Sequence, residues 1–169
     1  MTLLEKANQS TYNRLVNGDL SIENAVILWT NFEGRATKFG ESGKRTFNLA
    51  LSEEMAEQLD AEGWNIRCKE PRQEGDDPLY LTEVVVNMES QYPPNVVVYS
   101  NYRGNKKAVR MTSDTIKELD RIDIDNVDLV IHPYEHNRGE YKYKGYARAI
   151  HVTQAVSNDF GGKYADYEF

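Results

Sequence analysis

Aromatic and basic side chains alternate in the run Tyr-Lys-Tyr-Lys-Gly-Tyr-Ala-Arg at residues 141–148. In a β-strand every second side chain points to the same face, so Lys142, Lys144, Tyr146 and Arg148 would share one surface. The cations could hold phosphates while a ring stacks on a base, which is the chemistry of sequence-neutral binders of single-stranded nucleic acid. The alternative is a solvated strand face whose tyrosines pack at its edge.

Two loops repeat this combination of rings and cations. Residues 101–107 contain a tyrosine and three basic residues without an acid, and residues 34–45 contain a phenylalanine and four basic residues. An ordinary solvated loop is the alternative for both. With the cations placed along the sugar-phosphate chain and the rings on bases, the predicted nucleic-acid-binding residues are Arg35, Lys38, Phe39, Arg45, Tyr102, Arg103, Lys106, Lys107, Lys142, Tyr143, Lys144, Tyr146 and Arg148.

Two groups of residues resemble catalytic metal sites but lack the context that such sites need. Residues 132–136 read His-Pro-Tyr-Glu-His, the letters of a zinc-protease motif that works on a helix, whereas here a strand-like run precedes them. Asp123, Asp125 and Asp128 could bind Mg²⁺, although turn capping also explains them. We expect no enzyme activity, metal or cofactor, and keep a Mg²⁺-dependent nuclease or resolvase as the alternative.

The net charge of −7 would argue against a nucleic-acid partner if it were spread evenly. Residues 53–62 alone carry five acids and no base, so the remaining sequence is close to balanced. A chain that is acidic overall can still present a basic groove. The proposed chemistry therefore requires that these cations and rings gather along one common groove.

Cysteine content and hydropathy bear on the compartment. The single cysteine, Cys68, excludes an intrachain disulfide and fits a reducing cytoplasm. No apolar run approaches the roughly 20 residues that cross a bilayer. We expect a protein of the cytoplasm without a membrane segment.

The elements that must position these residues are mostly short strands. Alternation of apolar and polar residues predicts strands over 22–32, 44–51, 64–69, 79–88, 96–99, 108–111, 127–134 and 141–152. A helix is expected from the Ser52 N-cap to Gly63, and a second short one over 112–121. This order predicts a small antiparallel barrel over 21–154, preceded by a mobile arm over 1–20 and followed by a flexible acidic tail over 155–169.

Several short motifs resemble those of the single-stranded DNA-binding proteins encoded by tailed bacteriophages, small OB-fold proteins of replication and recombination. The resemblance covers roughly residues 22–153. It depends on residues 31–34, Lys38-Phe39, residues 43–47, Met55 with residues 63–65, and residues 126–134. The resemblance implies sequence-neutral binding of single-stranded DNA in the barrel groove and protection of replication intermediates in the host cell cytoplasm.

Relatives in this group often carry an acidic tail with a terminal phenylalanine that recruits replication enzymes. Asp166, Glu168 and Phe169 look like a reduced version of it, so the resemblance implies replication or recombination proteins as partners at these residues. The tail departs from the pattern in having few acids and no proline.

The expected fold is therefore mainly β, an OB-fold-like antiparallel β-barrel with two short helices and a flexible acidic C-terminal tail. The expected function is sequence-nonspecific binding of single-stranded DNA. An OB-type protein-interaction module is a further alternative. Assembly into a homo-oligomer and the choice between DNA and RNA stay open.

Overall fold

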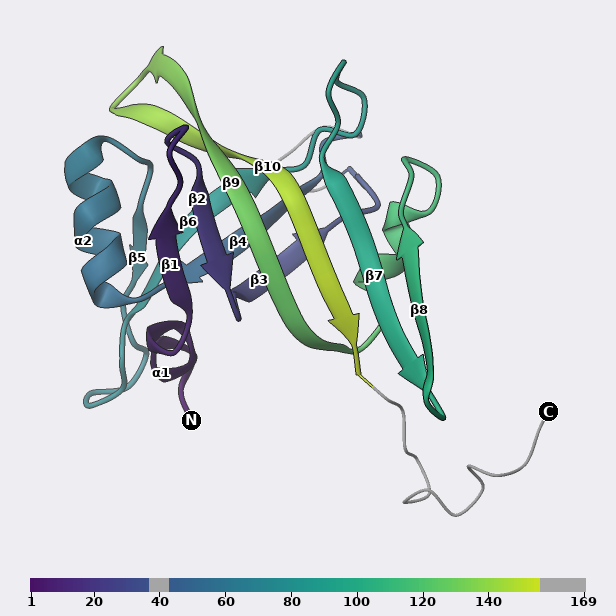
Figure 1. Cartoon of the computed structure of the whole chain (residues 1–169). Helices are drawn as coiled ribbons and strands as arrows, with labels where there is room; N and C mark the ends of the chain where they lie inside the picture. Colours follow the sequence, from purple (N-terminus) through teal and green to yellow (C-terminus); the bar gives the residue numbers. More distant parts are fainter. Residues whose placement is uncertain (37–42, 156–169) are drawn as a thin grey trace.

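The computed structural model describes residues 1–36 and 43–155, which form one strongly curled sheet with helices packed against it (Figure 1). The strand order is β1-β2-β9-β10-β6-β4-β3, with β5 beside β6, β7 beside β10, and β8 beside β7. The elements are α1 (Leu3–Asn8), β1 (Thr11–Arg14), β2 (Leu20–Glu23), β3 (Val26–Asn31), β4 (Thr46–Leu51), α2 (Glu53–Glu62), β5 (Arg67–Lys69), β6 (Leu79–Val85), β7 (Asn95–Tyr102), β8 (Asn105–Arg110), the 3₁₀ helix η1 (Ile116–Asp120), β9 (Ile124–Arg138) and β10 (Tyr141–Gln154).

β2 and β3 are two halves of one bent strand. β2 pairs with β9, β3 pairs with β4, and only Asn24 and Ala25 separate the two halves. Asn24 has a left-handed backbone (φ 55°), which asparagine adopts at low cost, and its amide donates to Asp128 Oδ1 at 2.9 Å. Because the halves pair near opposite ends of the strand order, the bend curls the sheet strongly. Within the described residues, no hydrogen-bonded seam joins β2 to β3.

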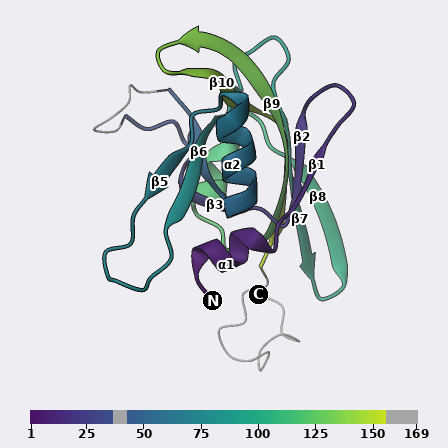
Figure 2. The same cartoon turned by 90° about the vertical axis from the view of Figure 1, so that its left-hand side faces the viewer.

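The core lies inside the curl, and α2 closes one side of it. Figure 2 shows α2 seated between the β5–β6 side and the β9–β10 side of the sheet. Met55 and Leu59 of α2 are buried there with Phe47 of β4 and Ile150 of β10. The expected caps of α2 are confirmed, since Ser52 Oγ accepts the Met55 amide at 3.2 Å and Gly63 ends the helix with φ 104°.

The N-terminal segment over residues 1–20 forms part of this body, which corrects the expectation of a mobile arm. Thr2 and Glu5 form a capping box for α1, and Ala7 is buried against β4 and β6. β1 pairs with β2, and Ser10 Oγ donates to the Asn24 carbonyl at 2.7 Å. The polar residues that weaken a long helix here end a short one and begin a strand.

The mainly β fold with two short helices is confirmed, and its connectivity adds detail. Most pairs are antiparallel, but β10 runs parallel to β6 in its first half and to β7 in its second half. The second expected helix is the short η1. The tail over 156–169 lies outside the described residues, as do Lys38 and Phe39. In the described part of the chain, no helix is long and apolar enough to cross a membrane.

Candidate nucleic-acid interface

Outward-facing side chains of five neighbouring strands form two adjacent rows across the sheet. One row contains His132 of β9 and Tyr146 of β10, with Val85, Thr46 and Asn31 as the next partners on β6, β4 and β3. Residues on either side of these positions, such as Gly145, Val84 and Phe47, point into the core. We call the residues of both rows on the face of the sheet away from the main core the outer band: His132, Tyr134, Lys144, Tyr146, Glu83, Val85, Thr46, Asn48, Leu28 and Asn31. Asn48 is buried on this face, and Leu28 packs against the small second core around Ala7.

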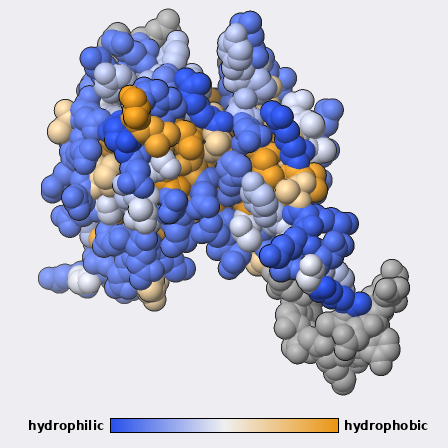
Figure 3. Space-filling view, in the orientation of Figure 1, coloured by the Kyte–Doolittle hydropathy of each residue, from blue (hydrophilic) through white to orange (hydrophobic). Residues whose placement is uncertain are grey.

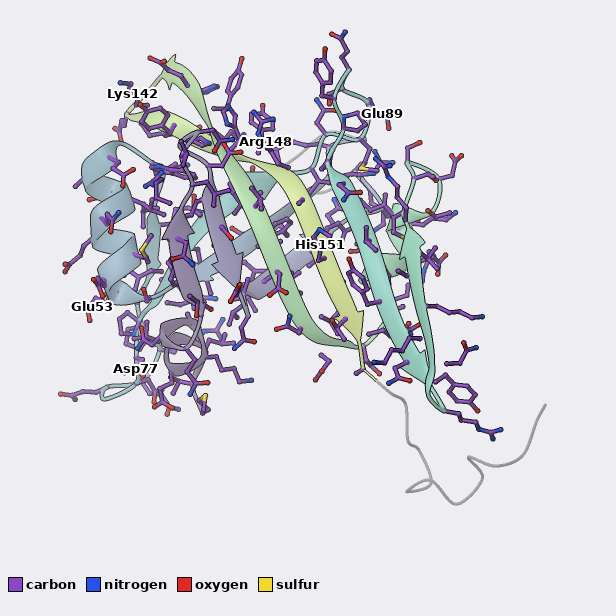
Figure 4. The ribbon with its side chains drawn as sticks, in the orientation of Figure 1. Glu53, Asp77, Glu89, Lys142, Arg148 and His151 are labelled. Atoms are coloured by element: carbon purple, nitrogen blue, oxygen red, sulfur yellow. The ribbon has the colours of Figure 1, made fainter. Side chains whose placement is uncertain are left out.

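A groove of about 520 Å³ lies at the β9–β10 end of the outer band. Its lining includes Tyr92, Tyr134, Tyr146, His132 and Arg148. Figure 3 shows the surface hollowed beside the raised loop before β7, and Figure 4 places Arg148 on the β9–β10 side of this hollow and Glu89 on the loop. The groove is open to solvent.

Tyrosine rings form the walls of the groove. Tyr92 is 82% exposed and Tyr134 is 49% exposed. Tyr134 meets Tyr146 edge to face, with ring centroids 5.0 Å apart and an interplanar angle of 80°. This pairing fixes the ring orientations, since edge-to-face contacts are a preferred aromatic geometry. Exposed, oriented rings of this kind can stack on nucleobases.

A buried carboxylate holds the cationic side of the groove. Asp19, in the turn between β1 and β2, accepts from Arg148 Nε at 3.1 Å and lies 2.7 Å from His132 Nδ1. The Asp19 side chain is 2% exposed, whereas Arg148 is half exposed. The guanidinium therefore keeps donors toward the groove while Asp19 fixes its position.

Two lysines and one acid form a cluster in the middle of the outer band. Glu83 Oε1 lies 3.5 Å from Lys44 Nζ and 3.7 Å from Lys144 Nζ. Burial lowers the pKa of Lys144, the Lys44 ammonium lowers it further, and Glu83 counteracts both. Two ammonium groups face one carboxylate, so the cluster carries a net positive charge in the middle of the outer band.

The structure assigns other roles to Arg45 and Tyr143. Arg45 is 13% exposed and donates to the carbonyls of Phe32 (2.9 Å) and Ser113 (3.1 Å) as well as to Glu89. Its guanidinium fastens three segments together and is not presented to phosphates, which corrects that part of the prediction. Tyr143 is half-buried and packs on the core, and Lys142 Nζ lies 5.1 Å from its ring. Arg35 is exposed and pairs with Glu33 at 3.3 Å.

The predicted residues of the β7–β8 turn lie away from the outer band. Lys106 and Lys107 line a separate groove of about 570 Å³ with Tyr99, and the exposed Tyr102 lies under the Arg103 guanidinium at 5.2 Å. Figure 1 places this turn at the opposite end of the molecule from the β9–β10 turn. The predicted cations and rings therefore form two groups and do not lie along the single common groove that the predicted chemistry requires.

β10 connects the two grooves along its outer face. Tyr146 and Arg148 line the first groove and Thr153 lines the second. Between them His151 stacks on Tyr99, with ring centroids 5.6 Å apart and Tyr99 Oη 2.8 Å from His151 Nδ1. The strand β10 thus carries residues that line both grooves.

Sequence reasoning missed several residues of the groove. Tyr134 falls inside the His-Pro-Tyr-Glu-His run, which drew attention only as a metal motif, although strand pairing sets it opposite Lys144. Tyr92 precedes two prolines at a turn, a position with no periodic signal. Asp19 sits in a segment expected to be an arm. Tyr134 and Lys144 both lie inside the expected strands 127–134 and 141–152, but the register that sets them opposite each other was not predicted.

The metal alternatives find no support in the described part of the chain. Residues 132–136 lie on strand β9, where His132 contacts Asp19 and His136 stacks on Tyr141 at 5.5 Å. Among residues 1–36 and 43–155, no three His, Cys, Asp or Glu side chains gather closely enough to hold a metal ion. Asp128 instead accepts from the Asn24 amide.

Comparison with known proteins places the chain in a family. The family model described as "Putative phage ssDNA-binding domain" matches residues 7–169. The single-stranded DNA-binding protein from bacteriophage Enc34 has a similar fold, with a TM-score of 0.52 and 10% identity over 92% of each chain. Its structure in complex with ssDNA matches with a TM-score of 0.50 and 11% identity, covering 90% of this chain and 99% of that chain. No curated protein matches the sequence.

The chain is a mainly β protein whose curled sheet carries rings and cations on its outer face. The chain belongs to the family of phage ssDNA-binding domains. The expected family and the expected mainly β fold are both confirmed.

Proposed function

We propose that this chain binds single-stranded DNA without sequence preference and protects it during phage DNA replication and recombination, in the host cell cytoplasm and without catalysis. The observation that carries the proposal is the groove lined by Tyr92, Tyr134 and Tyr146 with Arg148 on its wall. Membership of the phage ssDNA-binding family supports the same ligand.

The chemistry of the groove favours single strands over duplexes. Tyrosine rings stack on the faces of bases, and those faces are available only when the bases are unpaired. Every base has such a face, so stacking gives little sequence preference. Arg148 and Lys144 attract the phosphates that link the stacked nucleotides.

The second group of predicted residues extends the proposed footprint. In this proposal single-stranded DNA lies in the groove at Tyr146 and contacts Lys142 near the β9–β10 turn. A longer DNA strand would follow β10 and reach the β7–β8 turn, where it would contact Tyr102, Arg103, Lys106 and Lys107. His151 lies on β10 between the two grooves and contacts Tyr99 of the second groove, so aromatic side chains continue along the outer face of β10 from one groove to the other. Arg35 belongs to the same proposal, and so do Lys38 and Phe39, which lie outside the described residues and are included for their residue types alone.

Partner binding by the C-terminal residues is a separate part of the proposal. Asp166, Glu168 and Phe169 combine acids with a terminal ring, which suits a basic and apolar pocket on a replication or recombination protein. These residues lie outside the described part of the chain, and the support for this role is their composition alone. Homo-oligomerisation along a single strand is compatible with sequence-neutral binding.

Fluorescence anisotropy of labelled oligo-dT, with a matched duplex as control, tests the function. We expect binding of the single strand and much weaker binding of the duplex. The logarithm of the binding constant should fall linearly with the logarithm of salt concentration, with a slope of about 0.7 for each phosphate contacted. Equal binding to both ligands, or binding to neither, contradicts the proposal. A mixed-sequence oligonucleotide that binds far more weakly than oligo-dT contradicts the lack of sequence preference.

A further inference from the structure

Trp29 is a large aromatic side chain left on the outside of the sheet. It is 56% exposed, whereas the second tryptophan of the chain, Trp64, is 3% exposed. Trp29 lies at an irregularity in the pairing of β3 with β4, between Leu28 and Asn31, and its backbone is left-handed with φ 48°. A bulky residue is rarely found in that conformation, because its Cβ crowds the backbone. Such an outlier is a reason to look for a function that requires it.

Cations from β5 lie over the same surface. Lys69 Nζ is 5.1 Å from the centroid of the Trp29 ring, a cation–π distance. Arg67, two residues earlier on the same face of β5, donates to Asn48 Oδ1 on β4. Both side chains therefore extend from β5 across β6 toward β3 and β4.

The surface formed by Trp29, Lys69 and Arg67 adjoins the outer band. Leu28, beside Trp29, pairs with Asn48, which pairs with Glu83 of the lysine cluster. β3 and β10 are separated by β4 and β6, so the two strands are roughly 14 Å apart along the sheet, at about 4.8 Å for each of three strand spacings. A single strand that occupies the tyrosine groove and crosses the lysine cluster would arrive at Trp29. One OB fold covers roughly 4 to 16 nucleotides, which is enough to reach both places.

We propose that Trp29 is a second base-stacking site for single-stranded DNA, with Lys69 as a phosphate contact beside it. This inference rests on the proposed function and adds a site on β3 that the tyrosine groove does not include. A ring bordered by cations matches the chemistry of unpaired bases joined by phosphates. The Lys69 ammonium has a flexible four-carbon stem, so it can exchange the indole face for a phosphate when a base stacks there.

Intrinsic fluorescence gives a direct readout, because Trp29 and Trp64 are the two tryptophans of the chain and Trp64 is buried. Oligo-dT is titrated into the full chain while tryptophan emission and the anisotropy of a label on the DNA are followed together. We expect emission to be quenched in step with binding. In Trp29→Phe, which keeps a ring, binding should persist while the quenching disappears.

Loss of the ring or of the cation should weaken binding. Trp29→Ala should lower the affinity for a long oligo-dT by about 5- to 150-fold, the range expected for one stacked base. Lys69→Gln should weaken binding and reduce its salt dependence, whereas Lys6→Gln on the exposed side of α1 should change neither. Thermal unfolding of each variant shows whether the fold is retained, and Trp29→Phe keeps the test decisive if Trp29→Ala does not fold.

The outcomes separate this inference from the proposed function. If the wild-type chain binds oligo-dT by anisotropy but shows no tryptophan quenching, and folded Trp29 variants bind as tightly as wild type, the second site is wrong and the function stands. The exposed indole would then serve another partner, such as a protein. If the wild-type chain does not bind oligo-dT at all, the proposed function itself is wrong.

Discussion

Arg148 Nε lies 3.1 Å from Asp19 Oδ2, a contact that ties the groove wall to the turn between β1 and β2. The acid is buried and the guanidinium is half exposed, so the pair runs from the interior to the surface. The same carboxylate lies 2.7 Å from His132 Nδ1. The first twenty residues thereby belong to the proposed interface as well as to the sheet.

Replacing Asp19 by asparagine should destabilise the fold. The variant loses the charge that Arg148 and His132 face, and hydrogen bonds to charged groups contribute about 1.5–3 kcal/mol each. We expect the free energy of unfolding, measured by urea denaturation, to fall by about 1–3 kcal/mol. Asp114→Asn, at an exposed position, is the control. Equal stability of Asp19→Asn and wild type would show that this contact adds nothing to the fold.

Removing the Tyr146 ring should weaken DNA binding more than removing its hydroxyl. Tyr146→Ala should cost about 1–3 kcal/mol of binding free energy if the ring stacks on a base. Tyr146→Phe keeps the stacking face and should bind nearly as tightly as wild type. Anisotropy titrations with oligo-dT at one fixed salt concentration measure both. If the alanine and phenylalanine variants bind alike, Tyr146 does not stack.

Glu83→Gln should tighten DNA binding. Glu83 lies between Lys44 and Lys144 and competes with phosphates for both ammonium groups. Without the carboxylate, the salt dependence should steepen by about 0.7 for each lysine that gains a phosphate contact. Glu62→Gln makes the same change in a glutamate that pairs with Arg14, away from the outer band, and should leave both quantities unchanged. Weaker binding of Glu83→Gln would contradict a strand that crosses this cluster.

Lys144 should make the DNA affinity depend on pH at values below the ordinary pKa of lysine. Burial and the neighbouring Lys44 lower the pKa of Lys144 from 10.5. The lysine attracts phosphate only when protonated, so affinity should fall as the pH rises through this lowered pKa, while exposed lysines are still charged. Lys144→Arg stays protonated throughout and should remove that fall. Identical pH profiles for the two chains would exclude Lys144 as a phosphate contact.

Local sequence pattern was enough to predict the elements that obey one periodicity and have clear ends. The helix α2 begins after Ser52 and ends at Gly63, and its apolar residues recur at helical spacing. The alternation of residues in β10 predicted that Lys144 and Tyr146 lie on the outer face. The bent strand β2–β3 was also visible, as one run of β-forming residues. What the run could not show is that Asn24 turns the chain there, so that its two halves pair with different strands.

The site was harder to predict because its members meet only through long-range pairing. Arg45 lies in a basic loop and has the type of a phosphate ligand, yet backbone carbonyls of distant segments take its donors. Tyr134 has no basic neighbour in sequence and reaches the groove because β9 pairs with β10. Lys106 and Lys107 matched the expected composition but lie at the far end of the sheet. Composition identified candidates, and register decided which of them share a surface.

Photo-crosslinking of the full chain to an oligo-dT that carries 5-iodouracil, followed by peptide mapping, tests the position of the DNA most directly. The outer-face interface predicts crosslinks at Tyr92, Tyr134 and Tyr146, lost when unlabelled oligo-dT competes. Crosslinks confined to the β7–β8 turn or to the loop between β5 and β6, with none at these tyrosines, would contradict it.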